Sequence, residues 1–310
     1  MLEATLWATA IVIGLVLLVL SGDKLSDKIV DVARKAGVSP LVISIVLISL
    51  ATTLPELLTS AVASYQGLTG IALGNALGSI FANIALILGI AAVIRPLKAT
   101  KAAYENSLVM LGSFFLVIAL SLDGTLSRLD GAVLLGAYAV YLLWLLKKNA
   151  RKDVELESAE RATVIDYAFL LFLGLLLVLG AKLVVYGGTN IAKAIGVSEF
   201  VVGATIVAVG TSLPEMTNAV YGALRERGSI SIGNIIGADI MNALVVLGVA
   251  SVIRPLQTGA SILTVFLILA VMLPMVISLK RIHGLGRSMG IYFLAVYFIY
   301  LVLMFSGVEL

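Results

Sequence analysis

Two glutamates lie in the middle of long apolar stretches, and each directly follows a proline. Glu56 ends the segment Thr-Thr-Leu-Pro-Glu at 52–56, and Glu215 ends Thr-Ser-Leu-Pro-Glu at 211–215. A carboxylate at the centre of a membrane helix costs at least about 2.5–3.5 kcal/mol on insertion scales. Because no Lys or Arg stands near either glutamate within its stretch, the expected partner is a cation that binds and leaves.

The prolines predict backbone oxygens beside these carboxylates. Pro55 and Pro214 have no N–H to donate to the carbonyl four residues earlier. Unwound backbone is tolerated at membrane depth where it lines a cavity or packs inside protein. The carbonyls that we expect to be free lie near 49–51 and 208–210. The hydroxyls that stand one helical turn before a glutamate, on the same face, belong to Thr52 and Thr211.

The next span in each half is rich in glycine and carries further polar side chains. Its glycines recur every four residues, a spacing that permits close helix packing; they are Gly70, Gly74, Gly78, Gly233 and Gly237. The polar pair Ser79 and Asn83 becomes Ala238 and Asn242 in the second half. Asp239 is a third acid at this depth and faces either the site or a neighbouring polar group. Asn75 and Asn234 are candidates for contacts between helices.

Together these residues predict a site of hard oxygen ligands. Ca²⁺ takes about 6–8 oxygens in adaptable geometry, whereas Mg²⁺ demands a tighter octahedron. Two carboxylates neutralise one Ca²⁺, and the same oxygens can hold Na⁺ ions or protons instead. Mutually exclusive occupancy by Ca²⁺ or by monovalent ions is sufficient for exchange.

Composition places these groups in a membrane protein. Of the 310 residues, 61% are hydrophobic and 13% are charged, and the mean hydropathy is +1.12. Soluble domains carry about 25% charged residues, so this chain has too few to cover a water-facing surface. With no cysteine in the sequence, disulfides and thiol chemistry are excluded. We expect no cofactor and no nucleic-acid partner; the partners are the transported cations and the lipid bilayer.

The predicted fold is an all-α polytopic membrane protein with ten transmembrane helices. Each candidate has the roughly 20 apolar residues that a span requires. The candidates lie near 4–21, 40–64, 70–94, 104–121, 129–147, 165–187, 198–223, 230–253, 259–279 and 288–306. The first and sixth are expected to continue as long tilted helices to about 35 and 195. Asp23 is expected to form an interfacial ion pair with Lys24 or Lys28.

A gapless internal repeat relates the two halves of the chain. Residues 37–97 align with 196–256 at a constant offset of 159 residues. This divides the chain into a first five-helix repeat (1–147), a polar linker (148–163) and a second repeat (164–310). Because five is odd, the second copy enters the membrane from the opposite side, as in secondary transporters with a site at the repeat interface. The distribution of Lys and Arg places the linker in the cytoplasm and both termini outside the cell membrane.

At these motifs the chain resembles the calcium/cation antiporter superfamily, and most closely the prokaryotic sodium/calcium exchanger family. The resemblance implies two long helices that slide during alternating access and exchange of several Na⁺ for one Ca²⁺. It implies central Ca²⁺ ligands from the carboxylates of Glu56 and Glu215 and the carbonyls of Thr52 and Thr211. It implies additional Na⁺ ligands from Thr53, Ser212, Ser79 and the carbonyls of Ser49 and Ala208, with Asn83 and Asn242 lining the centre.

Three positions depart from the family pattern. Ala238 replaces an expected serine and removes a hydroxyl from an expected Na⁺ site, Ser49 stands where alanine is usual, and Asn242 stands where some relatives have aspartate. The aspartate is associated with K⁺ co-transport, so Asn242 argues against K⁺ dependence. The missing serine keeps a H⁺/Ca²⁺ antiporter open beside the Na⁺/Ca²⁺ antiporter.

Two other classes fit the sequence less well. Two acids in adjacent helices can activate water in a membrane enzyme, but the chain has no His-Glu-x-x-His and no Gly-x-Gly-Asp motif, and we predict that it is not an enzyme. A passive channel would show flux without coupling to a counter-ion.

Overall fold

The structure is a computed structural model that describes residues 2–35, 52–149, 163–226 and 228–306. Eight helices within these ranges are long and apolar enough to cross a membrane, or nine if one bent pair is counted as a single span. The prediction of an all-helical polytopic membrane protein is confirmed at this level. The predicted span at 40–64 begins outside the described residues.

The elements of the first half follow the predicted spans closely. In chain order they are α1 (Leu2–Lys35), α4 (Leu54–Tyr65), α5 (Thr69–Phe81), η2 (Ala82–Leu88), α6 (Gly89–Ile94), β1 (Leu97–Lys98), α7 (Lys101–Leu120), β2 (Thr125–Leu126) and α8 (Arg128–Asn149). The segment η2 is π-helical and joins α5 and α6 into one membrane-length unit, Thr69–Ile94.

The second half has a similar order of elements with two further π-helical segments, η3 and η4. In chain order the elements are α9 (Val164–Ile195), α10 (Glu199–Val202), η3 (Gly203–Val207), α11 (Ala208–Thr211), α12 (Leu213–Leu224), α13 (Gly228–Met241), η4 (Asn242–Val246), α14 (Leu247–Ile253), β3 (Leu256–Gln257), η5 (Gly259–Ser261), α15 (Ile262–Arg281), β4 (Gly284–Leu285) and α16 (Arg287–Phe305).

The core of the molecule consists of the two spans that contain η2 and η4. Within an apolar 18-residue stretch of each span, 78% of the residues are buried in Thr69–Ile94 and 83% in Gly228–Ile253, whereas the share is between 11% and 44% in the other membrane-length helices. Lipid covers the outside of a membrane protein, so only central spans are buried by other helices. The polar residues of these two spans therefore lie inside protein and not against lipid.

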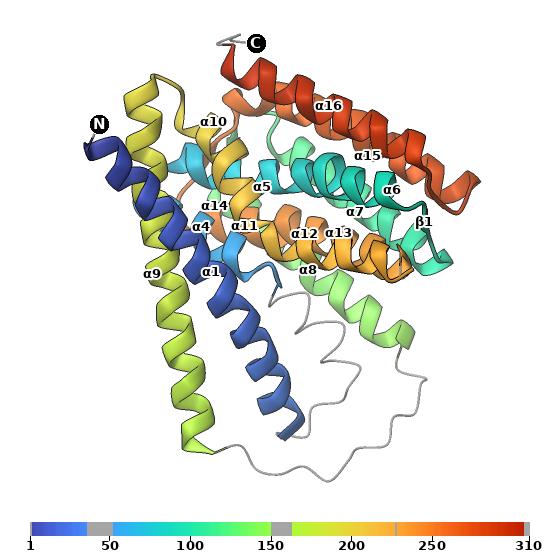
Figure 1. Cartoon of the computed structure of the whole chain (residues 1–310), viewed down its shortest axis with the longest axis horizontal. Helices are drawn as coiled ribbons and strands as arrows, with labels where there is room; N and C mark the ends of the chain where they lie inside the picture. The colour runs from blue at the N-terminus through green and yellow to red at the C-terminus, as the bar shows by residue number, and fades with distance from the viewer. Residues whose placement is uncertain (1, 36–51, 150–162, 227, 307–310) are drawn as a thin grey trace.

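The helices α1 and α9 lie side by side and run in opposite directions, obliquely across the remaining bundle (Figure 1). They contain 34 and 32 residues, so the predicted continuation of the first and sixth spans is confirmed. The two backbones approach closely where glycines meet. A Cβ added at Gly14 would lie 2.7 Å from the carbonyl oxygen of Gly180, and one added at Gly180 would lie 2.9 Å from that of Gly14.

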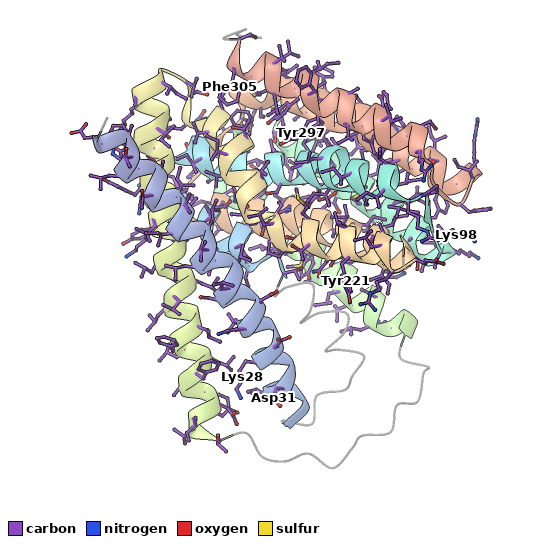
Figure 2. All side chains as sticks on the ribbon, viewed as in Figure 1. Lys28, Asp31, Lys98, Tyr221, Tyr297 and Phe305 are labelled. Atoms are coloured by element: carbon purple, nitrogen blue, oxygen red, sulfur yellow. The ribbon has the colours of Figure 1, made fainter. Side chains whose placement is uncertain are left out.

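An ion pair joins the same two helices near the lower end of α1 in Figure 2. Thr163 caps α9, and Asp166 completes the capping box by accepting the Thr163 backbone N–H. Lys28 donates to Asp166 Oδ1 at 2.5 Å and to Asp31 Oδ2 at 3.2 Å. The expected pair of Asp23 with Lys24 or Lys28 is not found among the described residues. Lys28 instead pairs with Asp31, one turn further along the same helix, and with Asp166 from α9.

Two short antiparallel ribbons connect the halves at the ends of the spans. In one, β1 pairs with β4, with Leu97 opposite Leu285. In the other, β2 pairs with β3, with Leu126 opposite Leu256. The strands β1 and β3 are 159 residues apart, as are β2 and β4. Exchange of the two halves would therefore convert one ribbon into the other.

Candidate functional site

Each of the two glutamates lies in the first turn of a helix that begins inside the molecule. In the second half α11 ends at Thr211 and α12 begins at Leu213, with a bend of 50° between Glu199–Thr211 and Leu213–Leu224. In the first half α4 begins at Leu54. Pro55 and Pro214 occupy the first turns, where a missing N–H breaks no helical bond. The break that the prolines predicted in the second half is present.

A helix start suits a buried carboxylate. Glu56 and Glu215 are both 0% exposed, so neither is solvated by bulk water. The unpaired N–H groups and the dipole at a helix N-terminus favour negative charge in the first turn. The helix start thus offsets part of the cost of burying each acid.

A hydrogen-bond network across the two halves surrounds Glu56. Ser212 Oγ donates to Glu56 Oε1 at 3.0 Å. Asn75 Nδ2 donates to the Glu56 backbone oxygen at 3.1 Å and to Ser60 Oγ at 2.9 Å. Thr211 Oγ1 donates to Asn75 Oδ1 at 3.0 Å. Motif residues from both halves, far apart in the chain, are therefore in direct contact.

Asn75 has a larger role in this network than the sequence suggested. The prediction of a contact between helices holds for Asn75, whose amide joins α5 to α4 and to α11. Its position directly after Gly74 in a repeated Gly-Asn pair was the available signal. The equivalent amide of Asn234 has no hydrogen-bond partner for Nδ2 among the described residues.

The surroundings of Glu215 are less complete within the described residues. The Thr52 side chain of the first half interacts with the Glu215 carboxylate, but neither carboxylate oxygen makes a hydrogen bond of ordinary geometry to a described residue. Glu56 lies within electrostatic range of both Glu215 and Asp239. Three acids from both halves thus share one buried region.

One predicted backbone ligand is engaged in helix bonds. The Ala208 carbonyl accepts the Ser212 N–H at 3.1 Å and the Thr211 hydroxyl at 3.2 Å. The expectation of a free carbonyl at 208 is wrong in this conformation, because the helix continues to Thr211 before it breaks. Ser49 and the carbonyls of 49–51 lie outside the described residues.

The remaining predicted site residues are gathered in the core. Fully buried or nearly so are Thr53, Ser79, Asn83, Ala208, Thr211, Ser212 and Asn242, and Thr52 is half-buried. The elements that carry them touch across the halves: α4 contacts η4, and α12 contacts η2. Asn83 and Asn242 each lie at the start of a π-helical segment, a distortion frequent at functional sites. Asn83 Nδ2 donates to Asp239 Oδ1 at 2.8 Å.

Many buried oxygens in this region have no hydrogen-bond partner among the described residues. They are Glu56 Oε2, Ser79 Oγ, Asn83 Oδ1, both carboxylate oxygens of Glu215, Asp239 Oδ2 and Asn242 Oδ1. Unsatisfied buried polar atoms are rare in proteins and require an explanation. Within the described ranges no three His, Cys, Asp or Glu side chains form a metal-binding group. Amide, hydroxyl and carbonyl oxygens would have to complete the shell of a bound cation, and hard cations prefer these ligands.

A multispan helical protein with buried acids and broken helices where its halves meet has the architecture of a secondary ion transporter. The family model described as sodium/calcium exchanger protein matches residues 6–147 and again residues 165–306. The chain belongs to the sodium/calcium exchanger family, a family of membrane transporters and not of enzymes.

The chain also aligns with individual relatives over nearly the whole length of both sequences. The chain is 37% identical over 288 residues to an uncharacterized membrane protein of Methanocaldococcus jannaschii, covering 93% of this chain and 94% of that protein. It is 32% identical over 327 residues to the putative antiporter CaxA of Alkalimonas amylolytica, covering 99% and 100%. A solved structure of the sodium-calcium exchanger NCX_Mj, soaked with Na⁺ and Sr²⁺, matches with a TM-score of 0.68 and 35% identity, covering 96% of this chain and 99% of that one.

Proposed function

We propose that the chain is a secondary active antiporter that exchanges Ca²⁺ for Na⁺ across the membrane by alternating access. The observation that carries this proposal is the set of buried, unpaired oxygens that both halves contribute around Glu56 and Glu215. Membership of the sodium/calcium exchanger family supports the same substrates. Ca²⁺ and Na⁺ are then substrates that occupy the oxygens in turn, so that binding of one requires release of the other.

We assign the ligands as the motif positions suggest. Ca²⁺ is bound by the carboxylates of Glu56 and Glu215 with the carbonyls of Thr52 and Thr211. Additional Na⁺ ligands come from Thr53, Ser212, Ser79 and the carbonyls of Ser49 and Ala208, while Asn83 and Asn242 line the centre. Two hydrogen bonds now engage both lone pairs of the Ala208 carbonyl, so its assignment as a Na⁺ ligand requires at least one of these bonds to be exchanged for the ion.

The same proposal includes ten transmembrane helices in two inverted five-helix repeats, 1–147 and 164–310. Four observations at the offset of 159 residues support it. The family model matches twice at this offset, the two ribbons are interchangeable, and Gly67 and Glu226 both have positive φ. The hydrogen bond from Ser60 to the Ala72 carbonyl is matched by one from Ser231 to the Ala219 carbonyl. The linker 148–163 is cytoplasmic and both termini are extracellular in this arrangement.

The helices α1 and α9 are the moving part in this proposal. They pack on each other through the Gly14–Gly180 contact and the Lys28–Asp166 ion pair, and both lie at the edge of the bundle (Figure 1). A pair tied together in this way can slide as one unit across the buried site. The core spans would then hold the ligands still while access changes sides.

A H⁺/Ca²⁺ antiporter with the same two glutamates is the second candidate. The observation that favours it is Ala238, which is buried and has no hydroxyl where Ser79 stands in the first half. Carboxylates alone can exchange Ca²⁺ for protons, whereas a Na⁺ site needs neutral oxygens as well.

The test is Ca²⁺ uptake by the full chain in liposomes, with Na⁺, K⁺ and pH gradients imposed separately. An outward Na⁺ gradient should drive uptake, and uptake driven by a pH gradient alone would favour the second candidate. Glu56→Gln and Glu215→Gln should each reduce uptake by more than about thirtyfold, because a buried charge is lost from the ligand set. Glu226→Gln, at an exposed glutamate, is the matched control. Wild-type rates in either site variant would contradict the assignment.

A further inference from the structure

Asp239 is a buried acid that contacts a site residue of the other half. It lies near the end of α13, is 1% exposed, and precedes Asn242 by three positions. Its Oδ1 accepts a hydrogen bond of 2.8 Å from Asn83 Nδ2, across 156 residues of chain. It lies within electrostatic range of Glu56 and of Glu215. The contact is therefore part of the region where the unpaired oxygens gather.

This hydrogen bond decides which end of the Asn83 amide faces the site. An asparagine amide has a donor end and an acceptor end, and a carboxylate only accepts. Nδ2 must therefore point at Asp239, and Oδ1 must point the other way. Asn83 Oδ1 is fully buried and has no hydrogen-bond partner among the described residues. A cation binds an amide through its oxygen and is repelled by its NH₂ group, so only this orientation is useful for binding.

The sequence repeat does not supply a second copy of this pair. The position 159 residues before Asp239 is Ile80, which is apolar and 0% exposed. Accordingly, neither Nδ2 nor Oδ1 of Asn242 has a hydrogen-bond partner among the described residues. The two central amides are equivalent in the sequence repeat, yet only that of Asn83 is held in one orientation.

We propose that Asp239 is a positioning residue of the cation site, which holds the Asn83 amide with its Oδ1 toward the transported cation. The proposal rests on the proposed function, in which Asn83 lines the site. In this proposal the Asn83 amide has a fixed orientation and the Asn242 amide does not, so the centre of the site is asymmetric. The acid acts through Asn83 and needs only its acceptor oxygen for this role.

The test is Ca²⁺/Ca²⁺ self-exchange by the full chain in liposomes, which requires no knowledge of the counter-ion. Asp239→Leu removes the acceptor and lets the amide turn, so the half-saturating Ca²⁺ concentration should rise about tenfold, with the maximal rate within about twofold. Asp239→Asn keeps an acceptor oxygen and should stay within about threefold of wild type. Asp239→Ala, which adds no bulk, replaces Asp239→Leu if that variant does not elute as folded protein.

A double-mutant cycle with Asn83→Ala separates positioning from a general structural role. In the Asn83→Ala background, Asp239→Leu should raise the half-saturating Ca²⁺ concentration by less than about twofold. In the Asn242→Ala background, it should raise that concentration by as much as it does in wild type. Equal effects in the Asn83→Ala and wild-type backgrounds would overturn the proposal. So would an Asp239→Asn variant as impaired as Asp239→Leu, because charge would then be the property that matters. Absence of any Ca²⁺ flux in wild type would instead overturn the proposed function and this inference with it.

Discussion

Gly78 is a position where a single methyl group should disturb the site without touching any ligand. It lies in α5 directly before Ser79, and α5 packs on η3 of the other half. A Cβ at Gly78 would lie 2.5 Å from the Ala204 carbonyl oxygen and 2.6 Å from the Ala204 Cα. Both are backbone atoms, so no side chain can rotate away. Ordinary contact begins at 3.4 Å, which requires α5 and η3 to separate by about 0.9 Å.

The expected result follows from this displacement. Overpacking of this kind costs about 1–3 kcal/mol, so Gly78→Ala should lower the melting temperature of the purified protein. Because Ser79 and Asn83 move with the same helix, Ca²⁺ uptake in liposomes should fall by about ten- to hundredfold, as misplacements near 1 Å do in other sites.

Gly112 provides the matched control. It lies in α7, and a Cβ there would meet nothing within 4 Å. Gly112→Ala should leave uptake unchanged and raise stability by about 0.5–1 kcal/mol, the usual gain from Gly to Ala within a helix. Wild-type stability and uptake in Gly78→Ala would refute the reasoning, as would equal losses in both variants.

Two further variants test contacts between the halves. Ser212→Ala removes the hydroxyl that donates to Glu56. A hydrogen bond to a charged group contributes about 1.5–3 kcal/mol, so the half-saturating Ca²⁺ concentration should rise at least about tenfold. An unchanged concentration would contradict a role of this contact in Ca²⁺ binding. The bonds to Asp166 and Asp31 hold the pKa of Lys28 above its ordinary value of 10.5. The resulting stabilisation should be complete below about pH 10.5 and lost as pH rises through the raised pKa. Lys28→Met should therefore lower the melting temperature at neutral pH and lose that difference at higher pH, whereas Lys24→Met at an exposed position should change neither.

Much of the fold was predictable because lipid imposes a simple rule on sequence. A span needs about 20 apolar residues, and the predicted spans coincide with the membrane-length helices α1, α7, α8, α9, α15 and α16. The predicted continuation of the first and sixth spans to about 35 and 195 also agrees with the ends of α1 and α9. The paired strands β1–β4 and β2–β3 were not predicted, since two-residue strands have no sequence pattern that distinguishes them from turns.

The site was predictable in its members but less so in its bonds. Motif position and residue type identified Glu56 and Glu215, since a carboxylate in an apolar span is costly and indicates a functional site. Residue type did not predict that the Ala208 carbonyl accepts hydrogen bonds within the helix. Whether this carbonyl is free depends on whether the helix breaks before or after Thr211. Residue type also did not predict which groups Asn75 contacts, because an amide in a glycine-rich span has several equally plausible partners.

Local sequence accounts for the spans, the proline breaks and the placement of the two glutamates within apolar spans, because each depends on residues within one or two helical turns and on the solvent that surrounds them. The contacts from Ser212 to Glu56 and from Asn83 to Asp239 each join residues 156 positions apart. These contacts form only when the two halves pack together, as they do where Gly78 lies directly against the backbone of Ala204. The sequence itself places Asp239 in one repeat and Ile80 at the equivalent position of the other. Only the packing of the two halves brings Asp239 to Asn83, so that this difference in sequence becomes a difference between the two central amides.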